Sequence, residues 1–329
     1  MKKSIRMICL FLALLMLWSC TPVEMETESS SSAAPIESEI PEESSESSPA
    51  TEESKDEESS VYTEVYVRPE ILDKSYAERA EYFGQYYEMD YDLNDAYFHN
   101  SVFVGNSIML HFSNFVTRKR ASDAGFLGKA QFFAAASFSF YNNANQTASS
   151  PDCALPLYAG TPMSISDAVG EMKIGTVYLS LMALNDIAIY SDGMTGILET
   201  YNLFVDLVED LNEKYPATEV VVLSNTYLHS SGDNGRNKLN NGSISDLNIR
   251  VLDYCNQNGL DFIDVSSVLL DDGKCLGTEF CSDIGSASFA CHLTEYAYNA
   301  WTFVLRDYAA AKQKGIWKNP ESMEGLLSQ

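Results

Sequence analysis

The chain has 329 residues and carries 47 Asp and Glu against 21 Lys and Arg, a formal net charge of −26. A protein this acidic repels nucleic acid and anionic membrane surfaces, so we expect no nucleic-acid partner and favour neutral or cationic substrates. Residues 61–329 are enough for one α/β domain with a sizeable core.

The N-terminus has the pattern of an export signal. Lys2, Lys3 and Arg6 precede an apolar run over 7–18, which forms a positive n-region and a short h-region. The run is shorter than the roughly 20 apolar residues of a membrane span, which argues against a retained transmembrane anchor.

Residues 17–20, Leu-Trp-Ser-Cys, resemble the lipobox of bacterial lipoproteins. This resemblance implies a signal peptide over 1–19 and a lipid on Cys20. The exported protein would then be anchored to the cell membrane by that lipid alone, facing outside. A plain secretory signal is the alternative.

Residues 21–60 consist mainly of Ser, Glu, Pro and Thr, with 13 acidic residues and one Lys. A segment with so little apolar surface cannot offset its ordering entropy and is predicted to be disordered, and its like charges extend it. We therefore divide the chain into a signal peptide (1–19), a lipidated, disordered acidic linker (20–60), an N-terminal arm (61–96), a folded domain (97–315) and a C-terminal tail (316–329).

The remainder of the chain alternates apolar runs with helical periodicity. Tyr76–Tyr87 in the arm is predicted to be a helix, and four apolar runs are predicted to be buried strands, each followed by a helix with one apolar face. The predicted strands are Ser101–Gly105, Thr176–Met182, Glu219–Leu223 and Leu260–Val265, and the predicted helices are Ile108–Val116, Ile197–Lys214, Ile244–Gln257 and Thr294–Lys312. This alternation predicts a parallel sheet covered on both faces, with reactive groups beyond the carboxyl ends of its strands.

Five cysteines remain once Cys9 leaves with the signal and Cys20 takes the lipid. An odd number in an exported protein, without a CxxC pair, indicates a reducing habitat or one reactive thiol. The sequence alone does not decide whether Cys275 and Cys281 form a disulfide bridge. The histidines are not spaced with the cysteines as in a zinc site, so no metal is expected. The five are Cys153, Cys255, Cys275, Cys281 and Cys291.

Three polar segments lie where predicted strands end or the last helix begins. Ser107 follows the first strand, where a serine is either an N-cap or a nucleophile beside N–H groups that favour an oxyanion. Asn185 follows the second strand, where it either forms a turn or donates to an oxyanion. His292 precedes the last helix, from which a base could lean over Ser107. The other histidines are predicted to be surface, packing or loop residues: His99, His111 and His229.

Taken in order, these segments resemble the motifs of SGNH (GDSL-type) hydrolases. The motifs are Phe103-Val104-Gly105-Asn106-Ser107, Leu184-Asn185-Asp186, and His292-Leu293-Thr294 followed by Tyr298, and the likeness spans about residues 97–308. The resemblance implies a flavodoxin-like three-layer α/β/α sandwich with a central parallel sheet, and ester hydrolysis without a metal or other cofactor. It implies Ser107 as nucleophile and His292 as general base, with the Ser107 N–H and Asn185 as oxyanion donors.

Three departures from the family pattern affect residues around the oxyanion. Asn106 and Ala183 stand where the family has Asp and Gly. The segment 133–143 lacks the glycine whose N–H joins the family's oxyanion hole, so Ser137 or Ser139 would offer one instead. Ser137 is our candidate.

A fourth departure concerns the acid that orients the histidine. The family places an Asp three residues before the histidine, where this chain has Phe289. Asp283 is the nearest carboxylate upstream, and an inserted Gly/Ser loop could bring it to His292. Alternatively a backbone carbonyl orients the imidazole in a Ser-His dyad, or the activity is weakened or lost.

These residues indicate a cell-surface serine esterase that removes short acyl groups, such as acetyl, from carbohydrate or another ester. The expected partner is an ester substrate, in particular an acylated polysaccharide, by analogy with the family. Acyl transfer to a sugar would use the same residues. The alternative is a catalytically weakened or inactive relative that binds glycan or a surface partner. A solute-binding lipoprotein fits less well, because such proteins are longer and two-lobed.

Overall fold

A five-stranded parallel sheet lies at the centre of the part of the chain that the structure describes. The structure is a computed structural model that describes residues 65–85, 93–233, 238–285 and 289–323. The predicted signal peptide, lipid site and linker lie outside these residues. The sheet has the order β2-β1-β5-β6-β7. Its strands are β1 (Ser101–Gly105), β2 (Gln131–Ala134), β5 (Thr176–Ser180), β6 (Glu219–Leu223) and β7 (Asp261–Ile263).

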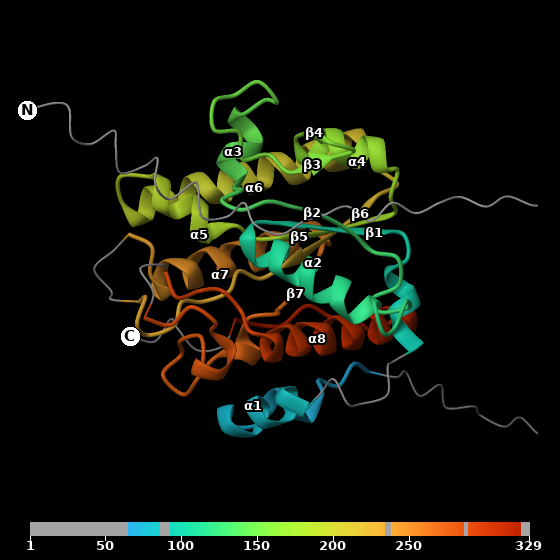
Figure 1. Ribbon diagram of the computed structural model, residues 1–329, viewed down its shortest axis with the longest axis vertical. Helices are drawn as coiled ribbons and strands as arrows, with labels where there is room; N and C mark the ends of the chain where they lie inside the picture. The colour runs from blue at the N-terminus through green and yellow to red at the C-terminus, as the bar shows by residue number, and fades with distance from the viewer. Residues whose placement is uncertain (1–64, 86–92, 234–237, 286–288, 324–329) are drawn as a thin grey trace, which may run out of the picture. The chain divides into compact units, whose positions relative to one another are not determined.

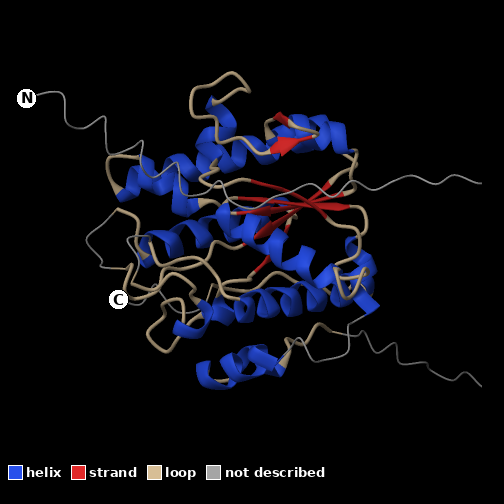
Figure 2. Cartoon of the chain, viewed as in Figure 1, coloured by secondary structure: helices blue, strands red, loops and turns tan. Residues whose placement is uncertain are grey.

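Helices cover both faces of this sheet. Figure 1 shows α2 (Ser107–Arg120) and α8 (Glu295–Gln313) on one face, and α4 (Ile165–Met172) and α6 (Gly193–Lys214) on the other. α7 (Asn241–Asn258) packs against α6 and β7. Figure 2 shows the strands enclosed between the two helical layers. The strand order is that of flavodoxin-like proteins, so the predicted three-layer α/β/α sandwich is confirmed.

Shorter elements surround this framework. In the arm these are η1 (Glu70–Asp73), α1 (Tyr76–Gln85) and η3 (Leu93–Phe98). Between β2 and β6 they are α3 (Phe140–Asn145), the hairpin of β3 (Leu157–Tyr158) and β4 (Thr161–Pro162), α5 (Ala183–Asp186) and η4 (Ile187–Ile189). After β7 they are η5 (Ser267–Leu269) and η6 (Thr278–Phe280).

Capping side chains set where the long helices begin. α6 starts earlier than predicted because Asp192 caps it, accepting a hydrogen bond from the Thr195 N–H at 2.9 Å. α7 likewise starts early because Asn240 accepts from the Ser243 N–H at 3.0 Å. Each cap satisfies a backbone donor that the helix itself cannot. Tyr86 and Tyr87, predicted to end the arm helix, lie outside the described residues.

The strand β2 was not predicted from the sequence. It has only four residues, and only Phe133 among them is buried, so its apolar run is weak. It nevertheless covers the edge of β1, and Phe103 on β1 lies between rings of both neighbouring strands. Phe103 stacks on Tyr178 with ring centroids 4.5 Å apart and on Phe132 with centroids 5.5 Å apart. The core around β1 is therefore continuous with both of its neighbours.

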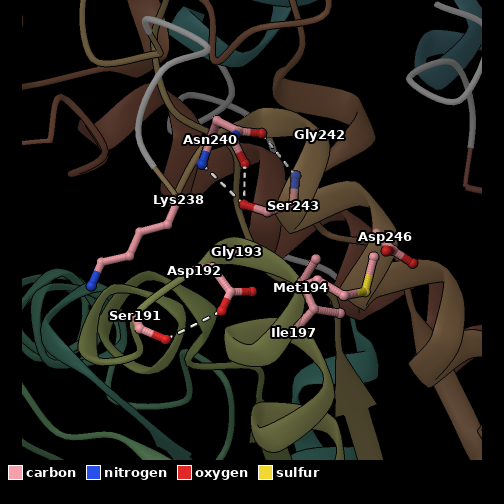
Figure 3. Close-up of a pocket in the computed structure, with 10 residues that line it drawn as sticks. All are labelled: Ser191, Asp192, Gly193, Met194, Ile197, Lys238, Asn240, Gly242, Ser243 and Asp246. Atoms are coloured by element: carbon pink, nitrogen blue, oxygen red, sulfur yellow. Dashed lines mark hydrogen bonds between the residues drawn. The ribbon is translucent and has the colours of Figure 1, made fainter.

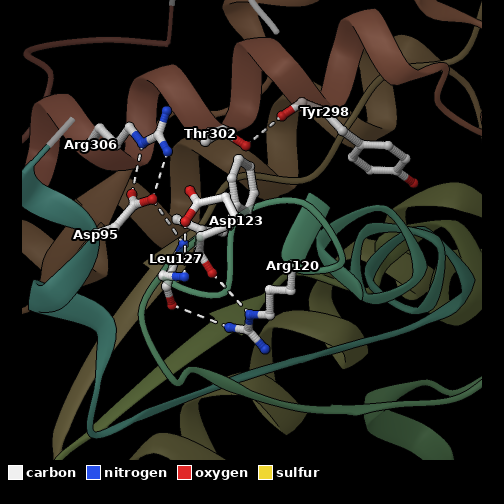
Figure 4. A network of polar contacts seen from close by, with 9 residues as sticks. Asp95, Arg120, Asp123, Leu127, Tyr298, Thr302 and Arg306 are labelled. Atoms are coloured by element: carbon white, nitrogen blue, oxygen red, sulfur yellow. Dashed lines mark hydrogen bonds and ion pairs between the residues drawn. The ribbon is translucent and has the colours of Figure 1, made fainter. Parts of the chain in front are cut away.

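The N-terminal arm packs on α8. The Asn299 side chain donates to the Phe83 carbonyl at 2.8 Å, and the Phe83 and Phe303 rings lie 5.6 Å apart. A buried ion pair joins η3 to α8, where Asp95 accepts from two nitrogens of Arg306 at 2.7 and 2.6 Å (Figure 4). Breaking such a pair leaves an uncompensated buried charge and costs about 3–5 kcal/mol, so the arm is part of the folded structure.

No helix among the described residues is both long enough and apolar enough to cross a membrane.

Candidate active site

The turn after β1 places Ser107 at the start of α2. Asn106 is the N-cap, and its Oδ1 accepts from the Ile108 N–H at 3.0 Å. Ser107 is therefore not the cap, and its hydroxyl is left for another role. A Cβ on Gly105 would lie 2.7 Å from Met109 Cβ, so glycine is what lets the helix begin this close to the strand. The Ser107 N–H lies in the first helical turn, where it has no partner within the helix.

His292 lies against Ser107 although the two residues are 185 positions apart. Its Nε2 is 3.1 Å from Ser107 Oγ, and its Nδ1 is 2.8 Å from Asp283 Oδ2. Serine, imidazole and carboxylate thus form a continuous hydrogen-bonded chain. Thr294 caps α8 through its side chain, which accepts from the Ala297 N–H, and this cap fixes the helix start just beyond the histidine.

A short antiparallel contact brings Asp283 to His292. Cys281 and Leu293 form an isolated bridge, and the Ser282 N–H donates to the His292 carbonyl at 2.8 Å. The second oxygen of Asp283 accepts from the His292 backbone N–H at 3.0 Å. The carboxylate therefore holds both the backbone and the ring of His292. Phe289, which occupies the position of the family's Asp, is exposed.

Asn185 and Ser137 lie on neighbouring segments beyond β5 and β2. Asn185 lies in the one-turn helix α5 rather than at a bare strand end, and its amide donates to the Phe138 carbonyl at 2.8 Å. Ser137 has a φ of 59°, in the left-handed region that glycine adopts most readily. It stands in the segment where the family has its glycine. The loop that carries Ser137 adjoins the end of β1, because the Ala135 N–H donates to the Gly105 carbonyl at 3.4 Å.

Asp186 ties α5 to α3. Its two oxygens accept from the Phe140 and Tyr141 N–H groups at 3.0 and 2.9 Å, in the first turn of α3. Burial raises the pKa of Asp186 to about 6, against the opposing effect of these hydrogen bonds. Ser139 is the N-cap of α3, and its side chain accepts from the Asn142 N–H at 3.0 Å. Ser137 is the candidate oxyanion donor because its left-handed φ suits the position of a glycine.

His111 is exposed, as predicted for a surface residue, and its ring also lies beside that of His292. It stands four residues after Ser107 on α2, so both side chains share one face of the helix. The rings of His111 and His292 have centroids 5.0 Å apart. Burial lowers the pKa of His111, and the charge of His292 lowers it further while Asp283 raises it. His229, by contrast, bonds to Ser231 in its own loop and to Thr278 at the start of η6.

Two cavities bear on where a substrate could lie. One of about 250 Å³ adjoins His292 and is lined by His111, Asn114, Arg118, Leu293, Glu295 and Tyr298. Another, of about 640 Å³, lies between the starts of α6 and α7, around their caps Asp192 and Asn240 (Figure 3). Neither Ser107 nor His292 lines either cavity. The smaller one is the better candidate for holding part of a substrate because it is lined by Leu293, next to His292 in the chain, and by His111, whose ring centroid lies 5.0 Å from that of His292.

All five cysteines of the described residues are free thiols, so the bridge considered for Cys275 and Cys281 is absent. Cys281 and Cys291 are buried beside Asp283. One atom each from Asp283, Cys291 and His292 could ligate a metal ion, and these atoms all lie within 4.8 Å of one another.

No family model and no curated protein matches the chain. Among solved structures it is similar to a protein described as an acylhydrolase from Bacteroides fragilis NCTC 9343, at 20% identity over 73% of this chain and 99% of that chain, with a TM-score of 0.47. It is also similar to a GDSL-like lipase from Bacteroides thetaiotaomicron VPI-5482 (13% identity, 72% and 100%, TM-score 0.45). A third similar structure is an acetyl xylan esterase (12% identity, 62% and 97%, TM-score 0.45). At these identities and TM-scores the functional assignment rests on the side-chain geometry.

Proposed function

We propose that the chain is a serine ester hydrolase of the SGNH type, with Ser107 as nucleophile, His292 as general base and Asp283 as the orienting acid. The observation that carries the proposal is the hydrogen-bonded chain Ser107 Oγ–His292 Nε2, 3.1 Å, and His292 Nδ1–Asp283 Oδ2, 2.8 Å. These two hydrogen bonds support an active enzyme over the alternative of a weakened relative, since Asp283 takes the place of the carboxylate missing at Phe289.

The three side chains divide the proton transfers among them. Asp283 accepts from Nδ1–H of His292, which leaves Nε2 unprotonated and able to take the proton of Ser107 Oγ. The serine oxygen attacks the ester carbonyl, and the imidazolium then protonates the leaving alcohol. Water repeats the sequence on the acyl-enzyme, releasing the acid and restoring the serine.

The developing oxyanion needs hydrogen-bond donors on the side of Ser107 that faces away from His292. The Ser107 N–H at the start of α2 and the Asn185 amide are two such donors, and the Ser137 N–H is the third. The hydrogen bond from Asn185 to the Phe138 carbonyl orients the amide through one of its two N–H groups, which leaves the other for substrate. Loss of one such donor typically costs about 10²–10³ in rate.

A sugar ester is the substrate class that the surroundings favour. The cavity of about 250 Å³ beside His292 is lined by side chains that can form hydrogen bonds, among them His111, Asn114, Arg118 and Glu295. Such a lining suits an alcohol rich in hydroxyl groups better than a long acyl chain. We therefore propose that the enzyme removes short acyl groups such as acetyl from carbohydrate, outside the cell, where the lipid on Cys20 would hold it.

The proposal is tested by esterase assays on the purified protein. The wild type is expected to hydrolyse p-nitrophenyl acetate and to release acetate from O-acetylated polysaccharide. Ser107→Ala should lower kcat by about 10³-fold or more, because the nucleophile is lost. A fluorophosphonate probe should label Ser107 covalently, as peptide mass spectrometry would show.

Ser113→Ala is the matched control, since it removes another serine hydroxyl from the same helix, α2. It should retain activity close to that of the wild type. Equal rates for the wild type and Ser107→Ala, or labelling at another serine, would contradict the assignment.

A further inference from the structure

A buried thiol that the proposed mechanism does not use lies beside the acid-base pair. Cys291 precedes His292 in the chain and is almost fully buried. Its Sγ lies within 4.8 Å of ligand atoms on both Asp283 and His292. A thiol, an imidazole and a carboxylate converge here although the sequence spacing did not suggest a metal site.

These three groups form a donor set that suits a soft or borderline divalent ion. Zinc binds thiolate, imidazole and carboxylate at about 2.0–2.3 Å, and sites with three protein ligands keep a fourth position for water. Ligand atoms around a tetrahedral zinc lie about 3.3–3.8 Å apart by the same distances. The Nδ1 and Oδ2 atoms of this site, 2.8 Å apart, need to separate only slightly.

The site also has support and access. The other oxygen of Asp283 accepts from the His292 N–H at 3.0 Å and from the Cys281 thiol at 3.4 Å, which holds the carboxylate in place. The side chains of His292 and Asp283 are 27% and 16% exposed, so an ion can reach them from solvent.

We propose that Asp283, Cys291 and His292 bind a soft divalent metal ion, such as Zn²⁺ or Cd²⁺, and that the bound ion blocks catalysis. The metal-binding part stands on the donor set alone, and the blocking part rests on the proposed function.

Binding would change the protonation of two groups. A thiol binds a metal ion as thiolate, so the Cys291 proton passes to solvent as the metal–sulfur bond forms. The ion also takes the place of the proton on His292 Nδ1, which moves to Nε2. An imidazole that carries its proton on Nε2 cannot accept one from Ser107, so the nucleophile stays inactive while the metal is bound.

Cadmium titration tests the site without reference to activity. The reduced full-length protein is expected to develop an ultraviolet cadmium–thiolate charge-transfer band that saturates at one ion per chain. In Cys291→Ser, which keeps the size of the side chain, the apparent Kd should rise by more than the roughly 10–100-fold that loss of an outer partner costs. Cys153→Ser, at another free and partly buried thiol, is the matched control and should keep the band.

An unchanged band in Cys291→Ser, or a band lost equally in Cys153→Ser, would overturn the site. A protein that hydrolyses no ester but shows the Cys291-dependent band would refute the proposed function and leave the site standing.

For the blocking part, stoichiometric Zn²⁺ should abolish ester hydrolysis by the wild type and a chelator should restore it. Each variant is compared with its own metal-free rate, and Cys291→Ser should resist the same Zn²⁺ concentration. Saturated binding with an unchanged wild-type rate would overturn the blocking part.

Discussion

At the scale of single residues, the Asp283 carboxylate fixes the direction of the imidazole ring. One oxygen holds the His292 backbone N–H and the other holds Nδ1. The residue therefore determines both where the ring stands and which nitrogen carries the proton. Both effects are needed for Nε2 to face Ser107 unprotonated.

Asp283→Asn should lower kcat by about 10⁴-fold, because the amide can favour the wrong tautomer of His292. KM is expected to change little. Asp271→Asn is the matched control, since the Asp271 carboxylate also accepts a backbone N–H, from Cys275 at 2.9 Å, but does not contact His292. Steady-state kinetics with p-nitrophenyl acetate measures both, and comparable losses in the two variants would contradict the role of Asp283.

The second residue whose effect can be measured is His111. Its ring faces His292, and Asp283, Arg118 and Glu295 are the other charged groups around it. The charge of His292 is one cause of the lowered pKa of His111. In His292→Gln the pKa of His111, followed by NMR of its ring protons, should therefore rise because that charge is gone. A His111 pKa that stays in place or falls would contradict this coupling.

At the scale of elements, the site is assembled from loops that adjoin three different elements. β1 leads to Ser107, β5 leads to Asn185, and the start of α8 fixes His292. Because β1 and β5 are parallel neighbours, their carboxyl ends meet at one edge, at the point where the strand order reverses. Helix α3, through Asp186, holds the Ser137 loop and α5 together.

Asp186→Asn tests that connection. An amide has one acceptor oxygen and cannot accept both N–H groups of α3 in the same way, so kcat should fall by about tenfold or more as the oxyanion donors lose their alignment. Ser164→Ala, which removes the cap of the more distant α4, is the control and should leave kcat unchanged.

The wild type and Asp186→Asn also allow a test of how stability depends on pH. The pKa of Asp186 is raised in the folded state to about 6 from its ordinary value of 3.8, so the folded protein binds this proton more tightly than the unfolded chain. The wild type should therefore gain about 1 kcal/mol relative to Asp186→Asn between pH 7 and pH 5. Urea unfolding at both pH values measures the difference, and a relative loss on acidification would have the wrong sign.

The sequence predicts many, but not all, of the residues that form the candidate site at the carboxyl ends of the strands. Ser107 and His292 are recognisable because one follows a buried apolar strand and the other precedes an amphipathic helix. From the sequence, Asp283 was only one of several candidates for the group that orients the imidazole. Its position beside His292 depends on backbone pairing between Ser282 and His292, which the sequence does not reveal. The spacing of four between Ser107 and His111 was a usable signal, because such residues share a helix face. The strand β2 offered too short an apolar run to be seen.

At the scale of the whole molecule, net charge bears on which substrates reach the site. The net charge of −26 would repel anionic polymers and favour neutral ones. This repulsion acts mainly within the Debye length, about 8 Å at physiological ionic strength, so it bears most on polymers that lie against the surface. A neutral acetylated polysaccharide should therefore be hydrolysed at a rate that depends little on salt.

Lipidation at Cys20 is the prediction that concerns where the protein is located, namely on the outer face of the cell membrane. In cells fed an alkyne-tagged fatty acid, the wild-type chain should carry the tag and its mature form should begin at Cys20. Cys20→Ala should carry no tag, because the lipid is attached through the cysteine sulfur. Cys9→Ala is the matched control, since it changes a cysteine within the predicted signal peptide and should leave tagging intact. An untagged wild type whose mature N-terminus lies elsewhere would instead support a plain secretory signal, with the same catalytic domain released from the cell.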